Sequence, residues 1–135
     1  MKSISFSVNG EPVAKGRPRF AGGHIYTPQK TAKYEHLIRS NYLLTDRVRF
    51  INDEELRLEI NAYMSIPKNV SKKVRQQMLS GEKRPTKKPD YDNIAKICSD
   101  SLNGFAYKDD SQIVISEINK YYSDTPRVEI LIYEV

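Results

Sequence analysis

Four aspartates in one short segment are the residues best suited to do chemistry. Asp90 and Asp92, here called the first acidic pair, lie two positions apart where an extended loop is expected to enter a helix. Asp109 and Asp110, the second acidic pair, follow on the segment that leaves that helix. Carboxylate oxygens are the ligands that Mg²⁺ and Mn²⁺ prefer, and such a cation can polarise a phosphodiester, generate hydroxide and stabilise the leaving oxygen. The segment is therefore predicted to bind a divalent metal.

Chain lengths allow the two acidic pairs to meet. The helix predicted over 92–102 is about 15 Å long at roughly 1.5 Å per residue. The connection over 103–110 can span about 26 Å at roughly 3.3 Å per residue. It can therefore run back along the helix and bring one member of the second acidic pair beside the first. Lys96, one turn after Asp92 on the same face, could stabilise the pentacovalent phosphorus or protonate the leaving group.

Each of these aspartates also has a structural interpretation. Asp92 can cap the helix that follows it, and Asp90 can form an Asx turn before it. The second acidic pair can be an ordinary solvated turn. Asp100, two turns after Asp92, is expected to support the site or the fold rather than bind metal. The metal interpretation is preferred because all four aspartates fall in one segment that can fold back on itself, beside a basic loop.

Basic residues surround this segment. The chain has 22 Lys and Arg against 17 Asp and Glu, a net charge of +5, which favours an anionic partner such as nucleic acid. The cations cluster at 15–19, 72–75 and 83–88, and the middle cluster is equally compatible with an ordinary solvated helix face. The side chains predicted to contact DNA are Lys15, Arg17, Arg19, Lys87 and Lys88. Carboxylates in so basic a neighbourhood oppose phosphate binding unless a divalent cation reverses the local sign.

Periodicity and length indicate one α+β domain over 1–135. A chain of 135 residues is about one domain long. A mobile basic loop is predicted at 14–26, and Thr27 is predicted to cap the helix that follows it. The predicted strands are 3–8, 55–66, 112–122 and 127–135, the last two as an antiparallel hairpin, and the predicted helices are 28–44, 72–79 with Ser71 as cap, and 92–102. Leu37 and Ile38 are expected on the buried face of the first helix.

The composition also restricts the cellular setting. No apolar run approaches the roughly 20 residues of a membrane-spanning helix, and the alternating residues 1–6 do not resemble a signal peptide. The only cysteine, Cys98, excludes an internal disulfide framework, and its place on the apolar stripe of helix 92–102 predicts a core residue. We expect a reduced, soluble, cytoplasmic protein.

Several strings in the sequence resemble the signature of the RusA family of Holliday-junction resolvases. They are PDYDNIAK at 89–96, DSLNG at 100–104 and DDSQI at 109–113, preceded by GEP at 10–12 and KGRPR at 15–19. Together these strings frame nearly the whole chain, and their combination is far more specific than Asp-x-Asp alone. The middle of the chain, roughly 45–85, matches no motif of the family.

The resemblance implies a homodimeric, magnesium-dependent endonuclease that cuts four-way DNA junctions by paired symmetric nicks in recombination and repair, with Mn²⁺ able to replace Mg²⁺. It also implies an α+β fold with helices packed on a mixed β-sheet. Carried over by position, the metal ligands are Asp90, Asp92 and Asp110, and the essential lysine is Lys96. Asp109 belongs to the matching pair, so the choice between it and Asp110 stays open.

Two other functions are compatible with the same residues. One is a non-catalytic nucleic-acid-binding module whose carboxylates are caps and turns. The other is a metal-dependent nuclease that acts on flaps, replication forks or RNA. For a junction resolvase, a homodimer is expected, because two like nicks need two metal sites and the chain has one acidic constellation and no internal repeat.

Overall fold

The computed structural model describes residues 2–135, and Met1, the first residue of the predicted domain, lies outside the described residues. The strands are β1 (Ser3–Asn9), β2 (Arg19–Ala21), β3 (His24–Tyr26), β4 (Leu56–Ser65), β5 (Ile113–Ser123) and β6 (Arg127–Glu134). The helices are α1 (Gln29–Leu43), α2 (Lys72–Leu79), α3 (Tyr91–Leu102) and the 3₁₀ turn η1 (Asp110–Gln112). Four strands form one mixed sheet in the order β1-β6-β4-β5, while β2 and β3 pair separately. This is the expected α+β domain.

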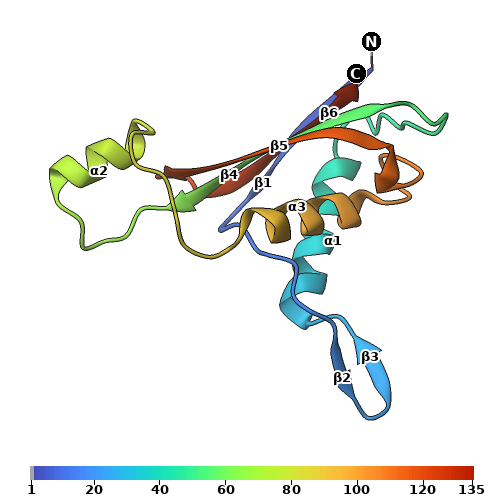
Figure 1. Ribbon diagram of the computed structural model, residues 1–135, viewed down its shortest axis with the longest axis horizontal. Coiled ribbons are helices and arrows are strands. Elements are labelled where there is room, and N and C mark those ends of the chain that lie inside the picture. Colours follow the sequence, from blue (N-terminus) through green and yellow to red (C-terminus); the bar gives the residue numbers. More distant parts are fainter. Residues whose placement is uncertain (1) are drawn as a thin grey trace.

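Strand β4 lies at the centre of the core because its apolar and polar residues alternate. Its buried side chains are Leu56, Leu58, Ile60, Ala62 and Met64. Helices α1 and α3 lie on the same side of the sheet in Figure 1, and they pack against each other as well as on the sheet. The apolar stripe of α3 is buried as predicted, and it consists of Ile94, Ile97, Cys98 and Leu102. Burial raises the pKa of the Cys98 thiol to about 12, as suits a core residue.

The predicted hairpin between the last two strands is wrong. β6 pairs antiparallel with both β1 and β4, and β5 pairs parallel with β4, so β4 lies between β5 and β6. Passing over one strand requires roughly 10 Å, and the four residue steps from Ser123 to Arg127 can reach about 13 Å. Alternation of apolar and polar residues predicts a strand, but it does not determine which other strands pair with it.

The basic loop predicted over 14–26 contains a β-hairpin. Gly22 and Gly23 have positive φ angles of 58° and 79°, the conformation that a two-residue type I′ turn requires, and β2 pairs with β3 across them. Figure 1 shows this hairpin projecting away from the sheet and the helices. Helix α1 follows it with Pro28 as N-cap, so the predicted cap at Thr27 is wrong by one residue.

Helix α1 also presents a different face to the core from the one predicted. Its buried residues are Thr31, Tyr34, Ile38 and Tyr42, whereas Leu37 is exposed. The buried Tyr42 is satisfied because its hydroxyl donates a hydrogen bond of 2.9 Å to the carbonyl of Val48. Two tyrosines therefore occupy positions that hydropathy alone would assign to leucine.

Helix α2 begins as predicted. The side chain of Ser71 accepts a hydrogen bond of 3.2 Å from the backbone N–H of Val74, which satisfies one of the free N–H groups at the helix start. Figure 1 shows α2 standing apart from α1 and α3, at one end of the molecule. No helix within residues 2–135 is long and apolar enough to cross a membrane.

Candidate active site

The basic segment before the hairpin is fastened to both core helices. The backbone N–H of Lys15 donates to the carbonyl of Asn93 in α3 at 3.1 Å. The next N–H, of Gly16, donates to Oγ1 of Thr31 in α1 at 2.9 Å. A Cβ at Gly16 would lie 2.6 Å from that same oxygen, so only glycine lets the chain pass this close to α1. The segment therefore has a fixed position beside the start of α3.

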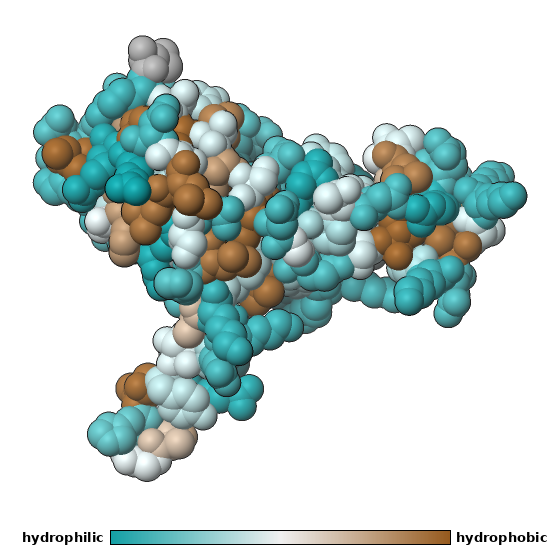
Figure 2. Space-filling view, turned by 180° about the vertical axis from the view of Figure 1, so that it is seen from behind, coloured by the Kyte–Doolittle hydropathy of each residue, from teal (hydrophilic) through white to brown (hydrophobic). Residues whose placement is uncertain are grey.

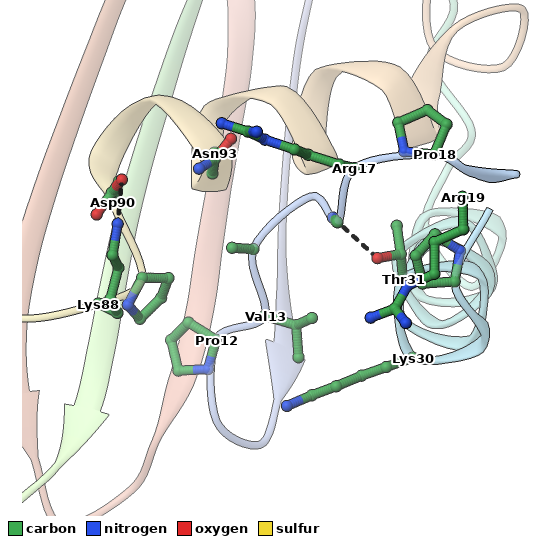
Figure 3. Close-up of a pocket in the computed structure, with 14 residues that line it drawn as sticks. Pro12, Val13, Arg17, Pro18, Arg19, Lys30, Thr31, Lys88, Asp90 and Asn93 are labelled. Atoms are coloured by element: carbon green, nitrogen blue, oxygen red, sulfur yellow. Dashed lines mark hydrogen bonds and ion pairs between the residues drawn. The ribbon is translucent and has the colours of Figure 1, made fainter.

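A hollow of about 540 Å³ opens between this segment, the start of α1 and the start of α3. Its charged lining residues are Arg17, Arg19, Lys30, Lys88 and Asp90. Figure 3 shows Arg17 extending across α3 toward Asn93, while Lys88 reaches Asp90 on the other side. Four cations and one carboxylate therefore face one concave surface, here called the first basic hollow. Lys30 was not among the predicted DNA contacts, because it stands between uncharged neighbours and belongs to none of the basic clusters.

The first acidic pair lies at the start of α3, as predicted. The structural alternative, in which Asp92 caps this helix, is wrong. Asp90 occupies the N-cap position, and its side chain makes no capping hydrogen bond. Its carboxylate pairs instead with the Lys88 ammonium at 2.8 Å. Asp92 is exposed in the first turn, where its Oδ1 accepts a hydrogen bond of 3.0 Å from the Asn93 N–H. The positive end of the helix dipole favours both negative charges here.

A second basic hollow, of about 610 Å³, adjoins the first at Lys88 and Asp90. It is lined by Thr86, Lys87, Lys88, Asp90, Tyr91, Asp92 and Lys120. The Lys120 ammonium, from β5, donates a hydrogen bond of 2.7 Å to the carbonyl of Lys87. The position of Lys120 was not predicted, because it depends on the parallel pairing of β5. Asp90 and Lys88 line both hollows, so the first acidic pair stands between two groups of cations.

Lys96 and Lys15 share one carboxylate. The Lys96 ammonium lies 3.6 Å from Oδ2 of Asp100, and the Lys15 ammonium lies 3.4 Å from the same oxygen. Lys15 also pairs with Glu35 of α1 at 2.7 Å. Burial by itself lowers the pKa of Lys15, but the hydrogen bond and charge of Glu35 and the charge of Asp100 outweigh it and raise that pKa. Lys15 thus holds α1 to α3, whereas Lys96 remains exposed.

The two residues of the second acidic pair have different roles in the fold. Asp109 caps η1: its Oδ2 accepts a hydrogen bond of 3.1 Å from the Ser111 N–H, and hydrogen bonds from Ser111 lower the pKa of its carboxyl. Asp110 donates its backbone N–H to Oδ1 of Asn103 at 2.8 Å. Within residues 2–135, no hydrogen bond or ion pair engages the Asp110 carboxylate. Of the two carboxylates, that of Asp110 is therefore the one without a hydrogen-bond or ion-pair partner among the described residues.

Within the described residues of one chain, the two acidic pairs do not form a cluster of three carboxylates that could hold a metal ion. Asn103, which holds Asp110, lies at the far end of α3, and the eleven residues from Asp92 correspond to about 16 Å of helix rise. Burial and then the charge of Asp110 raise the pKa of Tyr107, whose hydroxyl donates a hydrogen bond to the carbonyl of Ser99 in α3. Among residues 2–135, no three Asp, Glu, His or Cys side chains are close enough to hold one metal ion.

The strand order explains this separation. The chain runs back along α3 as expected, but the segment that does so is β5 and not the connection over 103–110. β5 begins at Ile113, three residues after Asp110, and its later residue Lys120 lines the second basic hollow together with the first acidic pair. The acidic residues that precede β5 therefore stay at the C-terminal end of α3. Each copy of the chain offers two carboxylates at one end of this helix and one uncommitted carboxylate at the other.

Comparison with known proteins extends over nearly the entire chain. A family model described as "Endodeoxyribonuclease RusA" matches residues 9–133, a range that includes both acidic pairs, Lys96 and the basic segment. A relative from Bacillus subtilis (strain 168), named "Uncharacterized protein YqaN", is 41% identical over 144 aligned positions. That alignment covers 100% of this chain and 99% of the relative.

Proposed function

This chain belongs to the RusA family of Holliday-junction endodeoxyribonucleases, and we propose that it resolves four-way DNA junctions by paired symmetric nicks that depend on Mg²⁺. Its proposed setting is DNA recombination and repair in the cytoplasm. The observation that carries the proposal is the position of the first acidic pair between two basic hollows. A DNA backbone bound by those cations would have a phosphodiester next to the carboxylates.

The proposed metal ligands include Asp90 and Asp92, because neither carboxylate is needed to hold α3. Asp90 makes no capping bond, and its partner Lys88 has a side chain that is 84% exposed. An exposed pair of this kind contributes little to stability, so a divalent cation can replace Lys88 without leaving a buried charge. The oxygen donors suit Mg²⁺ or Mn²⁺. Such a cation, when bound, supplies Lewis acidity and an activated water.

We infer that a second copy of the chain completes the site. If two α3 helices lie antiparallel about a two-fold axis, the start of one helix lies beside the end of the other. Asp110 of the second copy is then the proposed third ligand next to the first acidic pair, and the symmetry creates two such sites. Two sites related by a two-fold axis match the two nicks that resolution of a four-way junction needs.

The remaining charged residues have proposed roles that follow from their positions. Lys96, exposed one turn after Asp92, adds positive charge near the phosphate or protonates the leaving oxygen, and Asp100 holds its ammonium. Arg17, Arg19, Lys87 and Lys88 are the proposed phosphate contacts, because they line the two hollows. Lys15 is not among the proposed phosphate contacts, because its ammonium pairs with the carboxylates of Glu35 and Asp100.

A panel of substrates tests this function. End-labelled four-way junction, flap, replication fork, RNA hairpin and linear duplex of matched sequence would each be incubated with the protein, in Mg²⁺ and in EDTA. The proposal predicts paired symmetric cuts in two junction strands of like polarity in Mg²⁺ and no cuts in EDTA. Preferential cutting of flaps, forks or RNA would show a different nuclease. Junction binding without any cut in Mg²⁺ or Mn²⁺ would show a non-catalytic binding module.

A further inference from the structure

The β2–β3 hairpin carries two large apolar side chains that no part of residues 2–135 covers. Phe20 and Ile25 are directly opposite each other in the register, so both point to the same face of the hairpin. Their exposed fractions are 73% and 74%. Arg19 and Tyr26 are the neighbouring opposite pair, and alternation along the strands turns them to the other face. The hairpin thus has one apolar face and one cationic, aromatic face.

The shape of the hairpin favours insertion into a partner. Its turn consists of Gly22 and Gly23, which have no side chains, so the tip is narrow. Figure 2 shows hydrophobic atoms on this arm, which stands clear of the body at the lower left. The body therefore does not shield the apolar face.

Charge identifies the kind of partner. Between Glu11 and Glu35 the chain has five Lys and Arg and no Asp or Glu. Three of those cations, Arg17, Arg19 and Lys30, line the first basic hollow at the base of the hairpin. A second copy of this arm would carry the same charge and be repelled, whereas an anionic partner with flat apolar surfaces would be attracted. Nucleic acid has both properties, since its phosphates are anionic and its unstacked bases are apolar on their faces.

We propose that the hairpin enters the branch point of DNA bound in the first basic hollow, so that Arg19 on one face meets the phosphates while Phe20 and Ile25 on the opposite face contact unstacked bases. This assignment rests on the proposed function, because it requires branched DNA as the substrate. Apolar side chains that enter between bases compensate for the lost stacking, and contact between one base and one aromatic ring contributes about tenfold in affinity. The hairpin would thereby favour branched DNA over linear duplex.

A binding experiment without catalysis tests this proposal. The probe is a four-way junction with 2-aminopurine at the branch point, titrated with protein in EDTA, and its fluorescence rises when that base unstacks. The test variant is Phe20→Thr with Ile25→Thr, because threonine keeps the strand pairing of the hairpin. The matched control is Leu44→Thr, which removes an even more exposed apolar side chain, 86% exposed, from the body of the protein.

The wild type and the Leu44→Thr control are expected to raise the fluorescence, and the hairpin variant is expected to lose that rise. The hairpin variant should bind the junction about tenfold more weakly and linear duplex equally well. An unchanged fluorescence rise in this variant would overturn the proposal. A change in its mass by light scattering would also overturn it, since the face would then be a subunit contact. If the wild type unstacks the base but cuts no junction in Mg²⁺, the proposed function fails while the base contact stands.

Discussion

Oδ1 of Asn103 accepts a hydrogen bond of 2.8 Å from the backbone N–H of Asp110. This bond joins the end of α3 to the segment that leads into β5, and it fixes the position of the second acidic pair. Asn103, which holds the backbone of Asp110, lies about 16 Å of helix rise beyond Asp92. The same bond presents the Asp110 carboxylate at the end of α3 that an antiparallel second copy would bring to the first acidic pair.

Replacing Asn103 should therefore impair catalysis more than folding. Asn103→Ala removes one hydrogen bond, which contributes roughly 1 kcal/mol to stability. We expect a single-turnover rate of junction cleavage at least about tenfold lower, because the proposed ligand Asp110 loses its support. Junction affinity in EDTA should be unchanged, since no proposed phosphate contact is altered. A normal cleavage rate in this variant would show that the position of Asp110 is irrelevant to the reaction.

Asp92→Asn should separate binding from cleavage. The change removes a proposed metal ligand and a negative charge near the DNA, so cleavage should fall by at least roughly 10²-fold while junction binding stays equal or becomes tighter. Gel-shift titration in EDTA and cleavage in Mg²⁺ measure the two effects. Asp46→Asn, an exposed aspartate at the end of α1, is the matched control and should cut normally. Loss of folding in Asp92→Asn would indicate that Asp92 has a structural role.

The sequence was sufficient to predict the elements that carry the first acidic pair. The stripe of Ile94, Ile97 and Cys98 determines which face of α3 is buried, and so it leaves Asp92 and Lys96 on the outside. These are local relationships, set by a helical repeat of 3.6 residues. The cap at Ser71 and the buried face of β4 were also predictable, because each depends on residues that are close together in the sequence.

The position of the second acidic pair could not be predicted in this way. It depends on the parallel pairing of β5 with β4, a contact between strands that are distant in sequence, and alternation in β5 does not specify it. The structural role of Lys15 could not be predicted either. Its ion pairs with Glu35 and Asp100 form only after α1 and α3 have packed together. The β2–β3 hairpin could have been predicted, because Gly22-Gly23 is a turn signal. The segment was predicted as a loop because of its basic charge.

Lys15 should stabilise the fold in a pH-dependent manner. Its pKa in the folded protein is raised above the ordinary 10.5, so its stabilising effect is complete below that value and is lost as pH rises through the folded pKa. Lys15→Met should lower the free energy of unfolding near pH 8 by on the order of 2 kcal/mol, because two carboxylates lose their cation. Urea denaturation of both proteins should show this difference shrinking above about pH 10.5. A difference that stays constant up to pH 12 would show that the lost packing, and not the charge, is responsible.

The salt dependence of binding should identify the phosphate contacts. Arg17→Ala with Arg19→Ala removes two cations from the first basic hollow. The slope of log affinity against log salt should become shallower by about 2, because each lost contact accounts for roughly 0.9. Fluorescence anisotropy with labelled junction between 50 and 200 mM salt, roughly the range over which such contacts are resolved, measures this slope. Lys72→Ala with Lys73→Ala on α2 removes the same charge from side chains that line neither hollow, and an equal effect there would mean that net charge alone sets the slope.

Cleavage by mixed subunits tests the central claim most directly. Asp92→Asn and Asp110→Asn are each expected to be inactive alone, because each spoils both sites of a homodimer. In a mixed dimer with sites shared between copies, one site carries both changes and the other carries none, so labelled junction should again be nicked in Mg²⁺ at one of the two positions. A mixture of Asp90→Asn with Asp92→Asn damages both sites and should stay inactive. Failure of the first mixture to restore any nick, or full activity of either variant alone, would contradict a metal site built from two copies of this chain.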